Sequence, residues 1–313
     1  MWGAALLLLV LYLAPVLVSF CLPDPRSLVP WHQARRDPTG LSPDPAVTQE
    51  PVIQVFTAPA VAWRGLFSVH TWIAVKPTGA PRFTRYEVLG FGVANGAPAL
   101  RFDWMGPDNY CFGARPQILL DRRGAGVDGM IGQVRDAVAS YPYSISYRPW
   151  PGPNSNTFLA HIARQVPDLA IQLPSNAVGM DFLPGGRVVA PAPSGSGFQV
   201  SLYGLIGILF AAREGLEVNL LGLSLGVDPV RPALKLPALG RLGMAGYRMA
   251  AAAHFDCCAR KCCTISQPVA RHTPACEQMY SSAASRAPIR CGWPVTKGWT
   301  AIAMTRGMVS PSR

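Results

Sequence analysis

Charged side chains are scarce in this chain of 313 residues. They make up 14% of the sequence, whereas apolar residues make up 50%. Chains that stay disordered are typically rich in charge and poor in apolar residues. The composition therefore excludes disorder for the chain as a whole and predicts a sizeable hydrophobic core. Because the sequence also contains 30 glycines and 31 prolines, we expect short strands and frequent turns.

Cysteine is nearly absent from the middle of the chain. Cys21 ends the apolar N-terminal stretch, Cys111 is alone among positions 22–256, and the remaining cysteines lie after that range. A single cysteine cannot form an internal disulfide framework. The central part of the chain must therefore be held together by its hydrophobic core.

A basic stripe of the kind that binds nucleic acid is also missing. The formal net charge is +11, but residues 244–313 contain nine Lys and Arg against two acidic residues. The rest of the chain is therefore nearly neutral for its length, and it holds no run of Lys and Arg with interleaved aromatic residues. We expect no nucleic-acid partner.

The patterns that bind metals and phosphates are missing from the same region. Asp103, Asp108 and Asp181 lack the spacing of metal ligands. The glycine-rich stretch 190–197 is not followed by the Gly-Lys-Ser/Thr of a phosphate-binding loop. We expect neither a metal site nor a cofactor in this part of the chain.

The N-terminal segment, residues 1–22, contains no charged side chain. A helix of this length would be about 33 Å long, which is enough to cross the apolar core of a bilayer. We therefore expect a transmembrane helix. The alternatives are a cleaved signal peptide, which usually has a basic residue before a shorter apolar run, and a buried helix of a soluble protein. The proline-rich segment 23–50 predicts an extended linker.

Residues 51–243 have the pattern of one α+β domain built on an antiparallel sheet. Strands are expected where β-branched and aromatic residues gather between turn signals, at Val52–Thr57, Leu66–Lys76, Tyr86–Gly92, Ala99–Trp104, Gln117–Leu120 and Ser144–Tyr147. Helical spacing of apolar residues predicts a helix at Val127–Ser140, and a second helix is expected after Gly152-Pro153. A hairpin is expected further on, with arms Phe198–Ala212 and Leu216–Val227.

The C-terminal segment, residues 244–313, differs in character from the rest. It loses the strand pattern and gains Cys-Cys pairs and scattered arginines. We expect an atypical and poorly ordered tail. Its cysteines and histidines could be drawn as a zinc site, but adjacent cysteine pairs are not the Cys-x-x-Cys spacing that zinc sites use.

The string from Trp150 to Phe158 is the most distinctive in the chain. It places Ser155 in the first turn of the second expected helix. There the positive end of the helix dipole favours a nucleophile, and the free N–H groups can stabilise an oxyanion. Serine needs a base, and His70 on the second expected strand is the candidate. Glu87 on the next strand, or its neighbour Tyr86, would orient the imidazole.

Each of these residues also has a purely structural interpretation. Ser155, together with Asn154, fits a helix cap, because either side chain can accept from free N–H groups of the first turn. His70 fits a hydrogen-bonded strand histidine, and Glu87 fits a solvated strand residue. These alternatives stay open at the level of sequence.

Four strings together resemble a bacterial family of unassigned activity, the domain of unknown function 3750. They are Phe67–Trp72, Gly152–Phe158, Glu217–Gly222 and Arg231–Pro237. The resemblance covers roughly Val52–Gly243. It implies a membrane-associated bacterial protein. We accordingly expect the inner membrane, with the domain facing the periplasm, although basic residues just after the apolar run would favour the cytoplasm.

A weaker resemblance is to circularly permuted NlpC/p60-like papain folds. A strand histidine, a polar residue on the next strand and a nucleophile opening a helix occur there in the same order. The resemblance implies His70 as base, Glu87 as orienting residue and Ser155 in place of the usual cysteine, and we expect substrate contacts from Asn154, Asn156 and Trp72. A hydroxyl is a poorer nucleophile than a thiolate.

Three functions follow from these resemblances. The first is a hydrolase or an acyl or peptidyl transferase that uses His70 and Ser155. The second is an inactive papain-like domain that binds a cell-envelope ligand or protein. The third is a structural membrane-associated protein in which the motif only builds the fold.

Overall fold

The computed structural model describes residues 2–21, 29–30 and 32–243. The chain is a mixture of helices and antiparallel sheets, which confirms the predicted α+β class. The predicted tail, 244–313, and part of the predicted linker lie outside the described residues.

An N-terminal helix, α1, extends over Trp2–Cys21. It contains Pro15 and no charged residue. Within the described parts of the chain, no helix has both the length and the apolar character needed to cross a membrane.

A five-stranded antiparallel sheet forms the first half of the domain, with the strand order β4-β3-β2-β1-β5. Its strands are β1 Val52–Pro59, β2 Val69–Lys76, β3 Thr84–Val88, β4 Leu100–Phe102 and β5 Gln117–Arg123. All of them lie where strands were expected, within a few residues. The predicted strand Ser144–Tyr147 is wrong, because the backbone turns there and Ser146 N donates to Tyr143 O.

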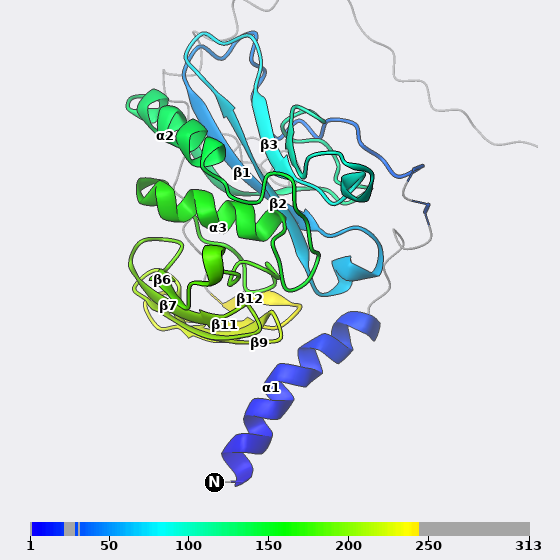
Figure 1. The fold of residues 1–313 in the computed structure, drawn as a ribbon, viewed down its shortest axis with the longest axis vertical. Helices are drawn as coiled ribbons and strands as arrows, with labels where there is room; N and C mark the ends of the chain where they lie inside the picture. The colour runs from blue at the N-terminus through cyan, green and yellow to red at the C-terminus, as the bar shows by residue number, and fades with distance from the viewer. Residues whose placement is uncertain (1, 22–28, 31, 244–313) are drawn as a thin grey trace, which may run out of the picture. The chain divides into compact units, whose positions relative to one another are not determined.

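Helices α2 (Val127–Ala139) and α3 (Ser155–Gln165) cover one face of this sheet (Figure 1). The predicted apolar stripes are buried, and they pack with the sheet into one core. Its largest fully buried members include Ile53, Ile73, Ile131, Phe158 and Ile162. Burying one such side chain stabilises the fold by about 1.5–3 kcal/mol.

A seven-stranded antiparallel sheet follows, and its strands run in chain order from β6 to β12. They are β6 Val189–Pro191, β7 Gly197–Leu202, β8 Ile206–Ala211, β9 Gly215–Leu220, β10 Leu223–Asp228, β11 Ala233–Leu236 and β12 Gly240–Gly243. Short 3-10 turns complete the domain at η2 Ala62–Leu66, η3 Val93–Asn95, η4 Pro167–Leu169 and η5 Pro184–Gly186.

The predicted two-arm hairpin is wrong in its number of strands. Each arm is itself a pair of strands, divided by a tight turn at Tyr203-Gly204 or Leu221-Gly222. Both residues of each turn have positive φ, between 51° and 85°. Two successive residues with left-handed backbone conformation match the twist of a hairpin, and glycine at the second position adopts this conformation without strain.

Helix α3 contacts both sheets. Its residues from Ser155 to Ala163 are all buried. On one side it shares the core with the five-stranded sheet. On the other side the Arg164 guanidinium donates to the side chain of Gln199 in β7 at 2.6 Å and to the carbonyl of Pro191 in β6 at 3.0 Å.

Candidate functional site

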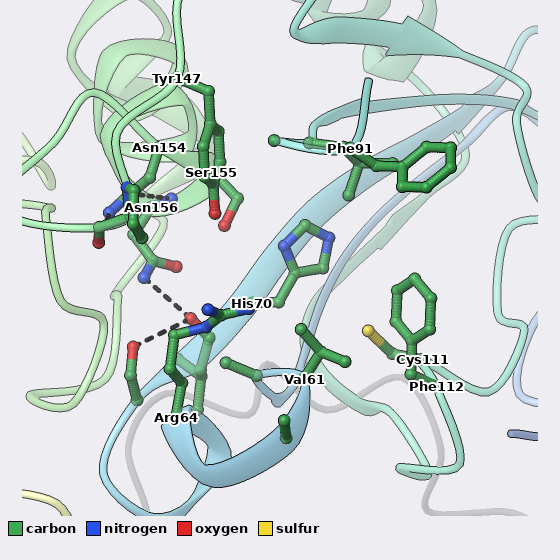
Figure 2. A pocket seen from close by; sticks show the side chains of 17 residues that line it. Val61, Arg64, His70, Phe91, Cys111, Phe112, Tyr147, Asn154, Ser155 and Asn156 are labelled. Atoms are coloured by element: carbon green, nitrogen blue, oxygen red, sulfur yellow. Dashed lines mark hydrogen bonds between the residues drawn. The ribbon is translucent and has the colours of Figure 1, made fainter. Parts of the chain in front are cut away.

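A cavity of about 570 Å³ lies where β2 and α3 begin (Figure 2). It is lined mainly by apolar side chains and backbone, with a few polar groups. The lining comes from five parts of the chain: residues 60–70, the loop 89–91, the pair 111–112, the segment 147–149 and the start of α3 at 154–156. Both His70 and Ser155 belong to it.

The start of α3 is fixed by Asn154, which confirms the predicted cap. Its Oδ1 accepts hydrogen bonds from Asn156 N at 3.0 Å and Thr157 N at 3.1 Å. Thr157 Oγ1 accepts in return from Asn154 N at 3.1 Å, which completes a capping box. The Asn154 amide also donates to Val178 O at 2.9 Å. Ser155 is therefore held as the first residue of the helix.

Asn156 joins the start of α3 to the start of β2. Thr71 Oγ1 donates to Asn156 Oδ1 at 2.9 Å. The Asn156 amide donates to Val69 O and to Val178 O, both at 2.9 Å. Asn154 and Asn156 line the cavity, as expected of substrate contacts. Their side-chain amides already bond inside the protein, so their observed role is to position the helix.

His70 is held from behind by Glu87. His70 Nε2 lies 3.1 Å from Glu87 Oε2, and the Arg85 guanidinium donates to the same oxygen at 2.7 Å. Glu87 is 1% exposed, so its interpretation as a solvated strand residue is wrong. Burial alone would raise the pKa of the Glu87 carboxyl, but the charge of Arg85 and the hydrogen bond with His70 hold that pKa below its ordinary value.

Trp72 does not fit its expected contact with substrate. Its side chain is fully buried, and it is not part of the cavity lining. The ring stacks on Phe56 at 5.5 Å between centroids and lies 4.2 Å from the guanidinium carbon of Arg85. Its Nε1 donates to Pro107 O at 2.7 Å. Trp72 therefore packs the sheet face behind His70.

The Ser155 hydroxyl is a polar group of the cavity that has no hydrogen-bond partner among the described residues. The residue is 4% exposed, and its Oγ takes part in no hydrogen bond with a described residue. Figure 2 shows the side chains of Ser155 and His70 directed into the same cavity. The backbone N–H of Ser155 also forms no hydrogen bond with a described residue, whereas the next two N–H groups of the helix donate to the Asn154 side chain.

His70 and Ser155 reach the cavity from different sides of the five-stranded sheet. Thr71 faces α3, so its neighbour His70 faces the opposite side, together with Glu87. The two side chains meet only because the cavity lies at the end of β2, where His70 is the second residue. No hydrogen bond joins them among the described contacts.

Three lining residues were not singled out from the sequence. Arg64, in η2, forms no ion pair or side-chain hydrogen bond with a described residue. Tyr147 is partly buried, and burial raises the pKa of its hydroxyl. Cys111 brings a thiol to the cavity from the face of the sheet that holds His70. Arg64 and Cys111 come from a turn and a loop without a periodic pattern, and Tyr147 ends the segment that was wrongly predicted as a strand. Only the chemistry of these side chains could have drawn attention to them.

Within residues 2–21, 29–30 and 32–243, no three His, Cys, Asp or Glu side chains lie together as they would around a metal ion. The cysteines that suggested a zinc alternative lie outside the described residues.

Residues 50–182 match the model of the family described as protein of unknown function (DUF3750). This part of the chain belongs to that family. The match includes the five-stranded sheet, helices α2 and α3, and every residue that lines the cavity. It ends before the seven-stranded sheet, and so it is shorter than the resemblance expected from the sequence. No curated protein and no solved structure matches the chain.

Proposed function

We propose that this domain is a hydrolase or an acyl or peptidyl transferase, with Ser155 as nucleophile, His70 as general base and Glu87 as the residue that orients His70. One observation carries the proposal. A buried serine hydroxyl that has no hydrogen bond to a described residue shares a cavity with an imidazole whose Nε2 is held by a buried carboxylate. A nucleophile, a base and an orienting acid are the parts that acyl transfer needs.

The proposed reaction uses these groups in turn. Ser155 Oγ attacks the carbonyl carbon of an ester or amide while its proton passes to Nδ1 of His70, the ring nitrogen that Glu87 leaves available. The N–H of Ser155 at the positive end of α3 donates to the oxyanion. His70 then returns the proton to the leaving group as the carbonyl–leaving-group bond breaks. Water, or an acceptor amine or hydroxyl, releases the acyl group from Ser155 by the reverse steps.

We also propose that this site is related in evolution to the catalytic site of permuted papain-like folds. The base on a strand, the orienting acid on the next strand and the nucleophile at a helix start occur in the chain order of permuted papain-like folds. A serine at the position of the usual cysteine would need stronger activation, because its hydroxyl is far less acidic than a thiol. The proposed setting is the bacterial inner membrane, with the domain in the periplasm and a cell-envelope molecule as substrate.

The lining of the cavity suggests what the substrate carries. Arg64 has no acidic partner among the described residues and lies in a cavity with apolar walls such as Val61, Phe91 and Phe112. A guanidinium in such a place suits a carboxylate or phosphate. We therefore propose a substrate with an apolar group and an anionic group.

A second candidate is an inactive domain that binds the same class of molecule. The observation in its favour is that His70 and Ser155 are not hydrogen-bonded and start from opposite sides of the sheet. In that case the cavity holds a cell-envelope ligand and the polar residues only shape it. The two candidates differ in whether the Ser155 hydroxyl reacts.

A serine-directed fluorophosphonate separates the candidates. The catalytic proposal expects covalent labelling of the intact protein, mapped by mass spectrometry to Ser155, and its loss in Ser155→Ala and in His70→Ala. Ser140→Ala is the matched control, because Ser140 is exposed at the end of α2. Labelling on Cys111 instead, abolished by Cys111→Ser, would move the nucleophile to the thiol. If neither Ser155 nor Cys111 is labelled, the inactive binding domain is the candidate that remains.

A further inference from the structure

The seven-stranded sheet is built with its apolar side outward. A sheet with one face in water normally buries apolar residues and exposes polar ones. In β9 the order is reversed: Leu216, Val218 and Leu220 are exposed, whereas Glu217 and Asn219 are buried. In β7, Phe198 and Leu202 are exposed and Gln199 and Ser201 are buried.

The exposed apolar residues form one continuous surface, here called the outer face. The strand register places apolar residues of neighbouring strands next to one another. The neighbours are Phe198 and Phe210, Leu202 and Ile206, and Ile208 and Val218. Leu234 likewise lies between Val227 and Leu242. The rings of Phe198 and Phe210 are 6.1 Å apart. Phe198, Leu202, Ile206, Phe210, Val218 and Leu242 are each 49–59% exposed. Contiguous apolar surfaces of this kind mark a docking site on a soluble domain.

The buried side chains show that this register is the intended one. Asp181 accepts hydrogen bonds from Gln199 and from Asn219, and Lys235 pairs with Glu217. A slip of one residue would turn every side chain to the opposite face and expose or break these bonds. The polar network inside the domain therefore holds the apolar residues outside.

The charged and aromatic residues at the ends of the strands favour one kind of occupant for the outer face. All three acidic residues of 183–243 are buried, whereas Arg187 is exposed and Arg213 is partly exposed at the ends of strands. Tyr203 lies in the β7–β8 turn and is 59% exposed. Trp150 is 51% exposed, and its Nε1 donates to Leu221 O in the β9–β10 turn at 2.8 Å. An apolar surface with cations and with Trp and Tyr at its margin complements an anionic lipid surface.

We propose that the outer face rests in the interfacial layer of an anionic lipid bilayer. An apolar surface set into the boundary between headgroups and acyl chains gains from the buried area and from the attraction of basic residues to anionic lipids. Helix α1 also presents apolar side chains, with Leu6 to Leu9 between 53% and 62% exposed. The proposal is independent of the reaction at Ser155.

The test places a fluorescent amino acid at Phe210, by genetic code expansion, in the full-length protein. A second protein carries the same amino acid at Val47, which is 76% exposed and lies outside the outer face. Both are reconstituted into vesicles of phosphatidylcholine with about 30% phosphatidylglycerol, with quenchers either on the acyl chains or, as iodide, in water. Position 210 is expected to be quenched by the lipid quencher at least about twofold more than position 47.

Two further variants test whether this quenching depends on the outer face and on its basic residues. Ile206→Asp with Val218→Asp should abolish lipid quenching at position 210 while the far-ultraviolet circular dichroism stays unchanged. Arg187→Gln with Arg213→Gln should weaken it, as should vesicles without phosphatidylglycerol.

Equal iodide quenching of both positions in vesicles would overturn the proposal. Protection of position 210 from iodide in the absence of lipid would also overturn it. If that protection rises with protein concentration, a second copy covers the outer face. If it is the same at all protein concentrations, another segment of this chain covers the outer face.

Discussion

Glu87 Oε2 lies 3.1 Å from Nε2 of His70 inside the five-stranded sheet, and it also accepts a hydrogen bond from Arg85 at 2.7 Å. The buried Glu87 carboxylate fixes the orientation of the His70 ring. It also links the stability of the sheet to the proposed chemistry.

Glu87→Gln should lower the unfolding free energy at pH 7 by about 3–5 kcal/mol, because it leaves Arg85 buried without its charge partner. The pKa of Glu87 is lower in the folded protein than in the unfolded chain. Its contribution is therefore complete above the unfolded pKa of about 4.5 and is lost as the pH falls through the folded pKa. Urea unfolding at pH 7 and pH 4 should show a smaller difference from the wild type at pH 4. The exposed Glu50→Gln is the control, and an equal loss in both variants would contradict the prediction.

Asn154→Ala should destabilise the domain by about 2 kcal/mol, the upper range for a helix cap, since the variant also leaves Val178 O without one of its donors. The same change should slow labelling of Ser155 by a fluorophosphonate, because the start of α3 would lose its position. Thermal unfolding and labelling rates measure the two effects. A stable variant that labels at the wild-type rate would show that Asn154 positions nothing.

Arg64→Gln should reduce the preference for anionic substrates. For 4-nitrophenyl hydrogen glutarate, kcat/KM should fall about tenfold or more, as expected when a charge-assisted hydrogen bond is lost. For the neutral 4-nitrophenyl pentanoate of the same chain length, it should stay nearly constant. Arg135→Gln, on the exposed side of α2, is the control. An equal fall for both esters would mean that Arg64 supports the structure rather than the choice of substrate.

Glu217 should make the seven-stranded sheet less stable at higher pH. Burial raises the pKa of its carboxyl to about 7, against the opposing effect of Lys235. Because the folded state holds the proton more tightly, stability is greatest below about pH 4.5 and falls as the pH rises to about 7, by no more than about 3 kcal/mol. Glu217→Gln cannot ionise and should flatten this dependence. The unfolding temperature at pH 5 and pH 8 tests this, and an unchanged slope would refute it.

Local pattern was enough for much of the site. The strands around His70 and Glu87 could be predicted because β-branched and aromatic residues gather between turn signals. The contact between these two residues followed from the pairing of neighbouring strands, which needs no distant information. The cap at Asn154 followed in the same way from the chemistry of a helix start.

The sequence by itself determined the α+β class, the elements of the five-stranded sheet and which residues of a strand share a face. Only the tertiary structure decided which face is covered. A period of two assigns Leu216 and Glu217 to opposite sides of β9, but burial depends on α3 and Asp181, which are far away in the chain. For the same reason, Arg64 and Cys111 joined the cavity only when packing brought their loops beside His70. Periodicity is a property of neighbouring residues, whereas solvent exposure is a property of everything that packs around them.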